Sequence, residues 1–213
     1  MSALGVRTAP GGLAPGPEAA DVLPLAPDTA GLISVRRAAP ADREALTRMF
    51  DRCTLATRYR RFHAPVKAIP ERYLAEALSG SAFHHALVAC QDPAASAAAA
   101  ADGDSDQVAG PVAAAACDPG ASVDGLIALA SCRMVDEGAA ELGLLIEDAW
   151  QRRGLGTRLL HDLVTHANQS GLRVLTAQLL AEQAWIIGLL RPHGTCRLRS
   201  ARDGVLNVTV CLG

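Results

Sequence analysis

The sequence QRRGLGT, residues 151–157, stands between a short apolar run and a long amphipathic segment. Where a turn enters a helix, the first backbone N–H groups have no internal acceptor, and the helix dipole leaves partial positive charge. Glycines at Gly154 and Gly156 let a diphosphate approach these amides without a Cβ in the way. The neighbouring Arg152 and Arg153 add positive charge. The pattern predicts a phosphate-binding turn.

Spacing excludes two well-known phosphate loops. A Walker loop needs Lys and then Ser or Thr after its last glycine, whereas Thr157 and Arg158 follow Gly156. A dinucleotide fingerprint needs a small third residue where Leu159 stands. From the residues alone, a plain loop with helix-capping glycines remains the alternative to an anion site.

QRRGLGT matches the Q/R-x-x-G-x-G/A acetyl-CoA motif and in this respect resembles the GNAT acetyltransferase superfamily. The order of predicted elements across residues 33–213 is also similar to that family. A second segment, TRYRRF at residues 57–62, is similar to one common in bacterial GNATs of the protein-lysine acetyltransferase type. This resemblance implies an enzyme that transfers the acetyl group of acetyl-CoA to an amine.

The resemblance also implies where acetyl-CoA binds. The strand at residues 139–146 should splay from the strand at residues 172–180, with the pantetheine arm in the opening. Backbone amides of Leu145 and Ile146 would bond the arm and polarise the thioester carbonyl, and the turn would hold the pyrophosphate. The residues expected to bind the cofactor are Leu144, Leu145, Ile146, Gln151, Arg152, Arg153, Gly154, Leu155, Gly156 and Thr157.

Glu141 is the candidate catalytic base. A lysine-like amine has a reference pKa of about 10.4, so it must lose a proton before it attacks. Glu141 resembles the glutamate on the corresponding strand of many GNATs, and strand alternation places Glu141, Gly143 and Leu145 on one face. The alternative is an exposed strand carboxylate that pairs with a cation. Glu147, in the following turn, is the second choice.

The chain departs from the family at the helix after residues 172–180. The family often has Asn and Tyr there, whereas this chain has Gln183 near the expected Asn, and Trp185, Ile186 and Ile187 offer no acid. Its two tyrosines, Tyr59 and Tyr73, lie in the N-terminal half, so no general acid is assigned. An acetyl-CoA-binding regulatory module with weak or no catalysis is therefore the competing hypothesis.

The elements that position these residues follow from hydrophobic periodicity. Strands are expected at residues 33–38, 83–90, 123–134, 139–146, 172–180, 196–202 and 205–210, and helices at 42–50, 70–78, 154–171 and 182–190. Arg58, Arg60 and Arg61 face an acidic substrate or the donor mouth, or else lie in a solvated charged turn. The order predicts a single α/β domain with a mixed, mostly antiparallel sheet flanked by helices.

Composition divides the chain and limits its function. Residues 1–31 hold five prolines and no aromatic residue, which predicts a disordered lead before a domain spanning 32–213. An Ala-rich insertion is expected at about 92–122. A formal charge of −2 argues against a nucleic-acid partner or an anionic membrane.

Partners and location follow from the same features. The cysteines and histidines have no zinc-ligand spacing, so no metal is expected and the thiols are interpreted as reduced and mostly buried. Without a secretory leader or an apolar run of about 18 residues, the chain is expected in the cytoplasm. The acceptor, a protein lysine or a small amine, and the choice between monomer and homodimer stay open.

Overall fold

The computed structural model describes residues 33–91, 125–200 and 204–213. The N-terminal lead predicted at 1–31 and the insertion predicted at about 92–122 lie outside the described residues. Within them no helix is long and apolar enough to cross a membrane.

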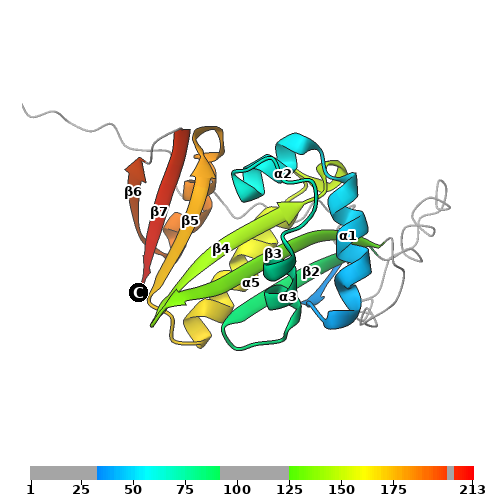
Figure 1. Cartoon of the computed structure of the whole chain (residues 1–213). Helices are drawn as coiled ribbons and strands as arrows, with labels where there is room; N and C mark the ends of the chain where they lie inside the picture. Colours follow the sequence, from blue (N-terminus) through cyan, green and yellow to red (C-terminus); the bar gives the residue numbers. More distant parts are fainter. Residues whose placement is uncertain (1–32, 92–124, 201–203) are drawn as a thin grey trace, which may run out of the picture.

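Seven strands form one sheet (Figure 1) in the order β1-β2-β3-β4-β5-β7-β6. The strands are β1 (Ile33–Arg37), β2 (His84–Gln91), β3 (Leu126–Asp136), β4 (Ala139–Ile146), β5 (Val174–Leu180), β6 (Gly194–Ser200) and β7 (Val205–Leu212). Every neighbouring pair is antiparallel except β4 and β5, which are parallel. The predicted mixed, mostly antiparallel α/β sheet is confirmed.

Helices cover both faces of the sheet. They are α1 (Arg43–Arg52), α2 (Leu55–Phe62), α3 (Glu71–Leu78), α5 (Leu155–Gln169) and α6 (Ile186–Leu190). Helices α1 and α3 lie on one face and α5 on the other (Figure 1). The buried stripe of α5, predicted from its 3.6-residue period, packs against the strands through Leu159, Leu163 and Val164. The two faces of β3 and β4 therefore belong to two different apolar clusters.

Helix α2 covers Arg58, Arg60 and Arg61, for which a solvated charged turn was one of the two alternatives. Thr54 caps the helix, because its hydroxyl accepts a hydrogen bond from the Thr57 amide at 3.3 Å. The helix ends at His63, which has a φ of 51°. The Arg-rich sequence forms an amphipathic helix of two turns. Its contacts with β4 and β5 are part of the site described below.

The helix predicted across residues 182–190 is shorter than expected. A 3₁₀ turn at Ala181–Gln183 comes first, and α6 covers only Ile186–Leu190 before a second turn that contains Pro192. One feature accompanies the break: the Gln183 side chain accepts a bond from the Leu180 amide at 3.1 Å, which closes the short turn before α6. The position where the family has a helical acid is thus in a broken segment.

Buried cysteines behave as apolar groups. Cys53, Cys90 and Cys132 are buried, Cys196 and Cys211 are half-buried, and all five are free. Burial raises the pKa of Cys53 to about 12, with the carboxylates of Asp148 and Glu147 adding to the effect. Burial also raises the pKa of Cys132 to about 11. These two thiols stay protonated at neutral pH, whereas Cys117 lies outside the described residues.

Candidate active site

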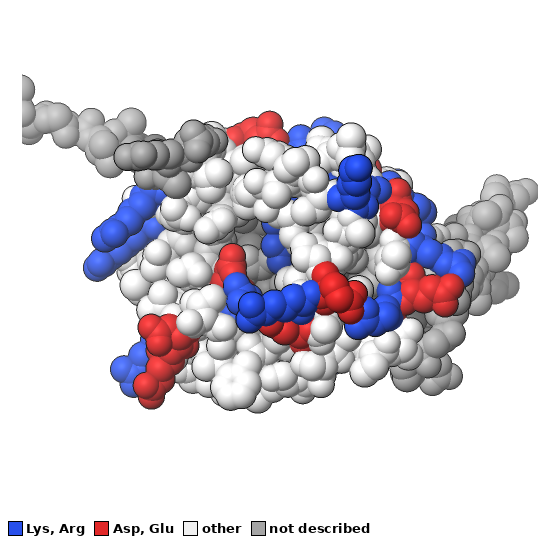
Figure 2. Space-filling view, in the orientation of Figure 1, with Lys and Arg blue, Asp and Glu red and all other residues white. Residues whose placement is uncertain are grey.

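An opening in the sheet between β4 and β5 forms a cavity. The two strands pair only where Ala139–Glu141 lies beside Val174–Thr176. Beyond that point β4 continues along β3 and β5 continues along β7, and the two halves of the sheet diverge (Figure 1). A cavity of about 850 Å³ occupies the divergence. Figure 2 shows a hollow in this face with charged side chains of both signs along one rim.

The register of β4 with β3 determines which backbone amides of β4 face the opening. The Glu147 amide donates to the Ile127 carbonyl on β3 at 3.0 Å, and amide directions alternate along a strand. The Leu145 amide therefore also faces β3, opposite Leu129. The amides of Leu144 and Ile146 face the opening instead. The prediction for Leu145 needs correction, because its N–H belongs to the sheet and only its neighbours present free donors.

The turn before α5 presents a second group of amides. Arg152 and Gly154 have positive φ values of 60° and 83°, which turn the chain sharply into the helix. The first helical bond runs from the Arg158 amide to the Gly154 carbonyl at 3.1 Å. The amides of residues 155–157 therefore have no acceptor within the helix. This geometry suits an anion at the start of a 15-residue helix.

Most of the predicted cofactor residues line the one cavity. They are Leu144, Leu145, Ile146, Gln151, Arg152, Gly154, Gly156 and Thr157, together with the candidate base Glu141. Two do not line it. Arg153 places its guanidinium 5.0 Å from the centre of the Trp150 ring, and the side chain of Leu155 is fully buried in the core. Leu155 can offer only its backbone amide to a ligand.

A family model of the Acetyltransferase (GNAT) family matches residues 82–194, slightly more than half of the chain. The chain belongs to this family. Solved structures agree in fold. The GNAT domain of S. lividans PAT is 21% identical, with a TM-score of 0.58 over 84% of this chain and 89% of that one.

Two further structures extend the likeness in fold. The protein yncA from Salmonella typhimurium, solved with its cofactor acetyl-CoA, is 17% identical, with a TM-score of 0.57 over 85% of this chain and 95% of that one. The ribosomal-protein-S18-alanine N-acetyltransferase from Escherichia coli is 16% identical, with a TM-score of 0.51 over 85% of this chain and 95% of that one. No curated protein sequence matches the chain. Family membership makes this an acetyltransferase domain with acetyl-CoA as its donor.

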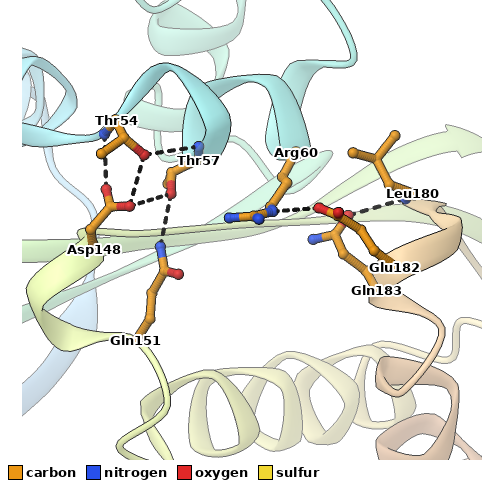
Figure 3. Close-up of polar contacts among 8 residues, drawn as sticks. All are labelled: Thr54, Thr57, Arg60, Asp148, Gln151, Leu180, Glu182 and Gln183. Carbon is orange, nitrogen blue, oxygen red and sulfur yellow. Dashed lines mark hydrogen bonds and ion pairs between the residues drawn. The ribbon is translucent and has the colours of Figure 1, made fainter.

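In this GNAT domain Gln151, the first residue of the motif, links two parts of the site through hydrogen bonds. We call the bonds made by Gln151 and Asp148 the brace. The Gln151 amide nitrogen donates to the Ile146 carbonyl at 2.9 Å. It also donates to the Thr57 hydroxyl at 3.0 Å, a bond drawn in Figure 3. Both of its N–H groups are thereby used within the protein. Gln151 therefore joins the end of β4 to helix α2 at the mouth of the opening.

Asp148 makes the second half of this brace. It accepts bonds from the Thr54 amide, the Thr54 hydroxyl and the Thr57 hydroxyl, each at 2.8 Å (Figure 3). Burial alone would raise the pKa of Asp148, but these hydrogen bonds outweigh it and hold the pKa below its usual value. The carboxylate is therefore ionised at neutral pH and ties α2 to the turn before α5.

On the far side of the opening, α2 contacts the other half of the sheet. Arg60 pairs with Glu182 at 2.8 Å (Figure 3), and His63 Nε2 lies 3.3 Å from the Gln178 carbonyl on β5. Gln183, the residue near the expected Asn, uses its side-chain oxygen on the Leu180 amide. Helix α2 thus spans the opening from β4 to β5.

Glu141 lines the cavity and pairs with a cation. Its Oε2 accepts a bond from Arg133, the residue directly opposite on β3, at 2.7 Å. The Glu141 side chain is 33% exposed, and its Oε1 has no hydrogen-bond partner in the described part of the chain. Glu147, the second candidate, instead pairs with Arg52 at 3.0 Å and does not line the cavity.

Sequence reasoning missed a pair of hydroxyl groups that line the same cavity as Glu141. Helix α3 brings Tyr73 into the cavity, where its hydroxyl lies 3.0 Å from that of Ser131 on β3. Behind Tyr73, the ring of His84 lies 5.6 Å away, and burial lowers the pKa of that imidazole. A single serine within the apolar run of β3 was the only signal in the sequence. Within the described ranges, no three His, Cys, Asp or Glu side chains gather to hold a metal ion.

Replacing Asp148 tests the brace. We expect Asp148→Asn to lower the free energy of unfolding by about 1 kcal/mol at pH 7, because a neutral amide has one acceptor oxygen fewer. A lowered pKa in the folded state stabilises the protein above the unfolded Asp pKa of about 3.9, and this stabilisation is lost as pH falls further. Urea unfolding at pH 7 and pH 3 should show the difference shrinking at pH 3. An equal difference at both values would contradict the role of the charge.

Replacing Gly154 tests the turn. The positive φ of Gly154 strains any L-residue, so Gly154→Ala should displace the first amides of α5. We expect about a tenfold rise in the Kd for acetyl-CoA, measured by calorimetry. Gly171→Ala is the matched control, because Gly171 also has a positive φ of 74° but follows the far end of α5. Equal affinity in the Gly154 variant would remove this turn from the donor site.

Proposed function

We propose that this chain is an acetyl-CoA-dependent N-acetyltransferase whose acceptor is a primary amine. One observation carries the proposal. Unpaired β4 amides, the free amides at the start of α5 and the Glu141 carboxylate all border one cavity. Donor binding and proton removal can therefore take place at adjoining positions of one opening.

On the donor side, the residues fit a long ligand with a diphosphate at one end. The amides of Leu144 and Ile146 would bond the pantetheine arm as a missing strand would. The amides of residues 155–157, with Arg152 beside them, would hold the pyrophosphate. Bound acetyl-CoA supplies the thioester. A fixed N–H at Leu144 or Ile146 then stabilises negative charge that develops on a carbonyl oxygen.

Glu141 would take the proton from the acceptor amine. Arg133 holds Oε2 of the carboxylate, and among the described residues Oε1 has no hydrogen-bond partner. A positioned carboxylate accepts the proton directly or through one water molecule. The face that carries Glu141 also carries Gly143 and Ser131, so the acceptor would approach from the side of α2 and α3.

Tyr73 supplies the acid that the sequence left unassigned. Its hydroxyl reaches the cavity from α3 and lies within hydrogen-bond distance of Ser131. We propose that Tyr73 donates a proton to the departing thiolate and that Ser131 orients it. This role replaces the helical tyrosine that the family often has after β5.

Two acceptors fit the proposal, a protein lysine side chain and a small amine. The TRYRRF segment favours a protein lysine, because it is similar to bacterial GNATs of that type. The competing hypothesis, a regulatory module that binds acetyl-CoA with weak catalysis, draws on the pairing of Glu141 with Arg133 and the broken segment before α6.

Glu141→Gln tests the base. We expect kcat to fall about 100-fold or more, because the amide keeps the shape but accepts no proton. The Kd for acetyl-CoA should change less than about twofold, since the donor contacts are backbone amides. Glu137→Gln, an exposed carboxylate in the same β3–β4 hairpin, is the matched control and should keep full activity. An unchanged rate in Glu141→Gln would remove Glu141 from catalysis.

A thiol-release assay separates the enzyme from the module. Saturating acetyl-CoA should raise the Tm under either hypothesis, because a ligand bound only by the folded state stabilises it. Free CoA should then appear only when an amine from a panel of lysine peptides and small amines is added. A Tm shift without amine-dependent thiol release would favour the regulatory module, and no shift would defeat both.

A further inference from the structure

Arginines dominate the charged groups on the acceptor side of the cavity. Arg60, Arg61, Arg72 and Arg133 all line it. Three of them have a carboxylate partner: Arg60 pairs with Glu182 at 2.8 Å, Arg72 with Glu76 at 2.9 Å and Arg133 with Glu141 at 2.7 Å. Among the described residues, Arg61 has neither a carboxylate nor another hydrogen-bond acceptor. One cationic group in the cavity therefore has unused donors.

Aromatic rings hold the Arg61 guanidinium in place. Its central carbon lies 4.9 Å from the ring centre of Phe62 and 4.8 Å from that of Tyr73. Stacking of this kind orients a planar guanidinium and leaves its N–H donors, which lie in its plane, free to bind a ligand. The side chain is half-buried, so an anion there would be less screened than at an exposed arginine.

Gly143 provides the room for this arrangement. A Cβ at position 143 would overlap the Arg61 guanidinium. The guanidinium therefore lies directly against β4, at a position on the same face as Glu141. Two residues along a strand span about 7 Å, so a group bound by Arg61 and a group bound by Glu141 lie roughly that far apart.

We infer that Arg61 binds a carboxylate of the acceptor, so that the acceptor is an amine with a carboxylate a few atoms away. This inference rests on the proposed N-acetyltransferase function. Arg61 would hold the carboxylate through two parallel N–H bonds while Glu141 faces the amine. A free amino acid provides this pair of groups. A peptide lysine with an acidic neighbour provides it as well.

Matched substrates test the inference. Free α- and ω-amino acids are compared with their carboxamides, which keep the amine and lose the negative charge. The same comparison uses lysine peptides with Glu or Gln beside the lysine, which separates the two sources of carboxylate. We expect the wild-type domain to prefer the carboxylate member of at least one series by about 10- to 100-fold in kcat/KM.

Variants of Arg61 then assign that preference. Arg61→Gln should lose most of the preference, by lowering kcat/KM for the carboxylate and not for the amide. Arg61→Lys should restore part of it, because the charge stays and the planar fork is lost. Arg48→Gln, an exposed arginine on α1 outside the cavity, is the control and should keep the full preference. Equal losses for both substrates would show that Arg61 only supports the fold, which overturns the inference.

A binding measurement separates this inference from the proposed function. Calorimetry on the CoA-bound domain should show carboxylate amines binding at least tenfold more tightly than carboxamides, and only with Arg61 present. If such binding occurs without turnover of any amine, the proposed function fails and the carboxylate site stands. If amides and carboxylates react and bind equally in the wild-type domain, the inference is wrong and the proposed function stands, whether or not Arg61→Gln folds.

Discussion

The short parallel pairing between β4 and β5 is the constraint on which the rest of the structure depends. Only Ala139–Glu141 and Val174–Thr176 join the two parts of the sheet. On one side, β4 is paired with β3 along its whole length, and on the other side β5 is paired with β7. Each part can therefore stay rigid while the edge of β4 beyond Glu141 remains unpaired. The amides on this edge have no strand partner among the described residues and border the cavity, so a ligand that bonds like a strand can pair with them.

Helix α2 sets the width of that opening, and its two attachments differ in strength. On the β4 side, Asp148 and Gln151 make a compact network with Thr54 and Thr57 that is partly buried. On the β5 side, the pair between Arg60 and Glu182 is largely exposed, and exposed ion pairs contribute little. The helix is therefore anchored to the half that carries Glu141 and only loosely to the other. Movement between the halves would leave Arg61, Gly143 and Glu141 together.

Local periodicity was enough to predict the long elements, because α5 and β4 have clear patterns. Contacts between distant segments were not available from the sequence. The direction of the Leu145 amide depends on register with β3, and the brace formed by Gln151 depends on where Thr57 lies. Helix α2 was missed because its capping residue, Thr54, precedes a strongly charged run. Tyr73 was not assigned as the general acid because it lies in the N-terminal half of the chain. In the fold, α3 brings it beside Ser131.

Gly143 is one position where such a contact between distant segments occurs, because Arg61 of α2 lies against it. Glycine in the interior of a strand is unfavourable, since it adds backbone entropy and provides no side chain to pack. Nothing in residues 139–146 explains why β4 tolerates that cost. In the folded protein the Arg61 guanidinium occupies the space that a Cβ would need. The rings of Phe62 and Tyr73 complete that space on the other sides, so the glycine, the arginine and the two rings form one unit. Among the described residues the cation of this unit has no carboxylate partner, so ligand binding accounts for its position better than packing alone.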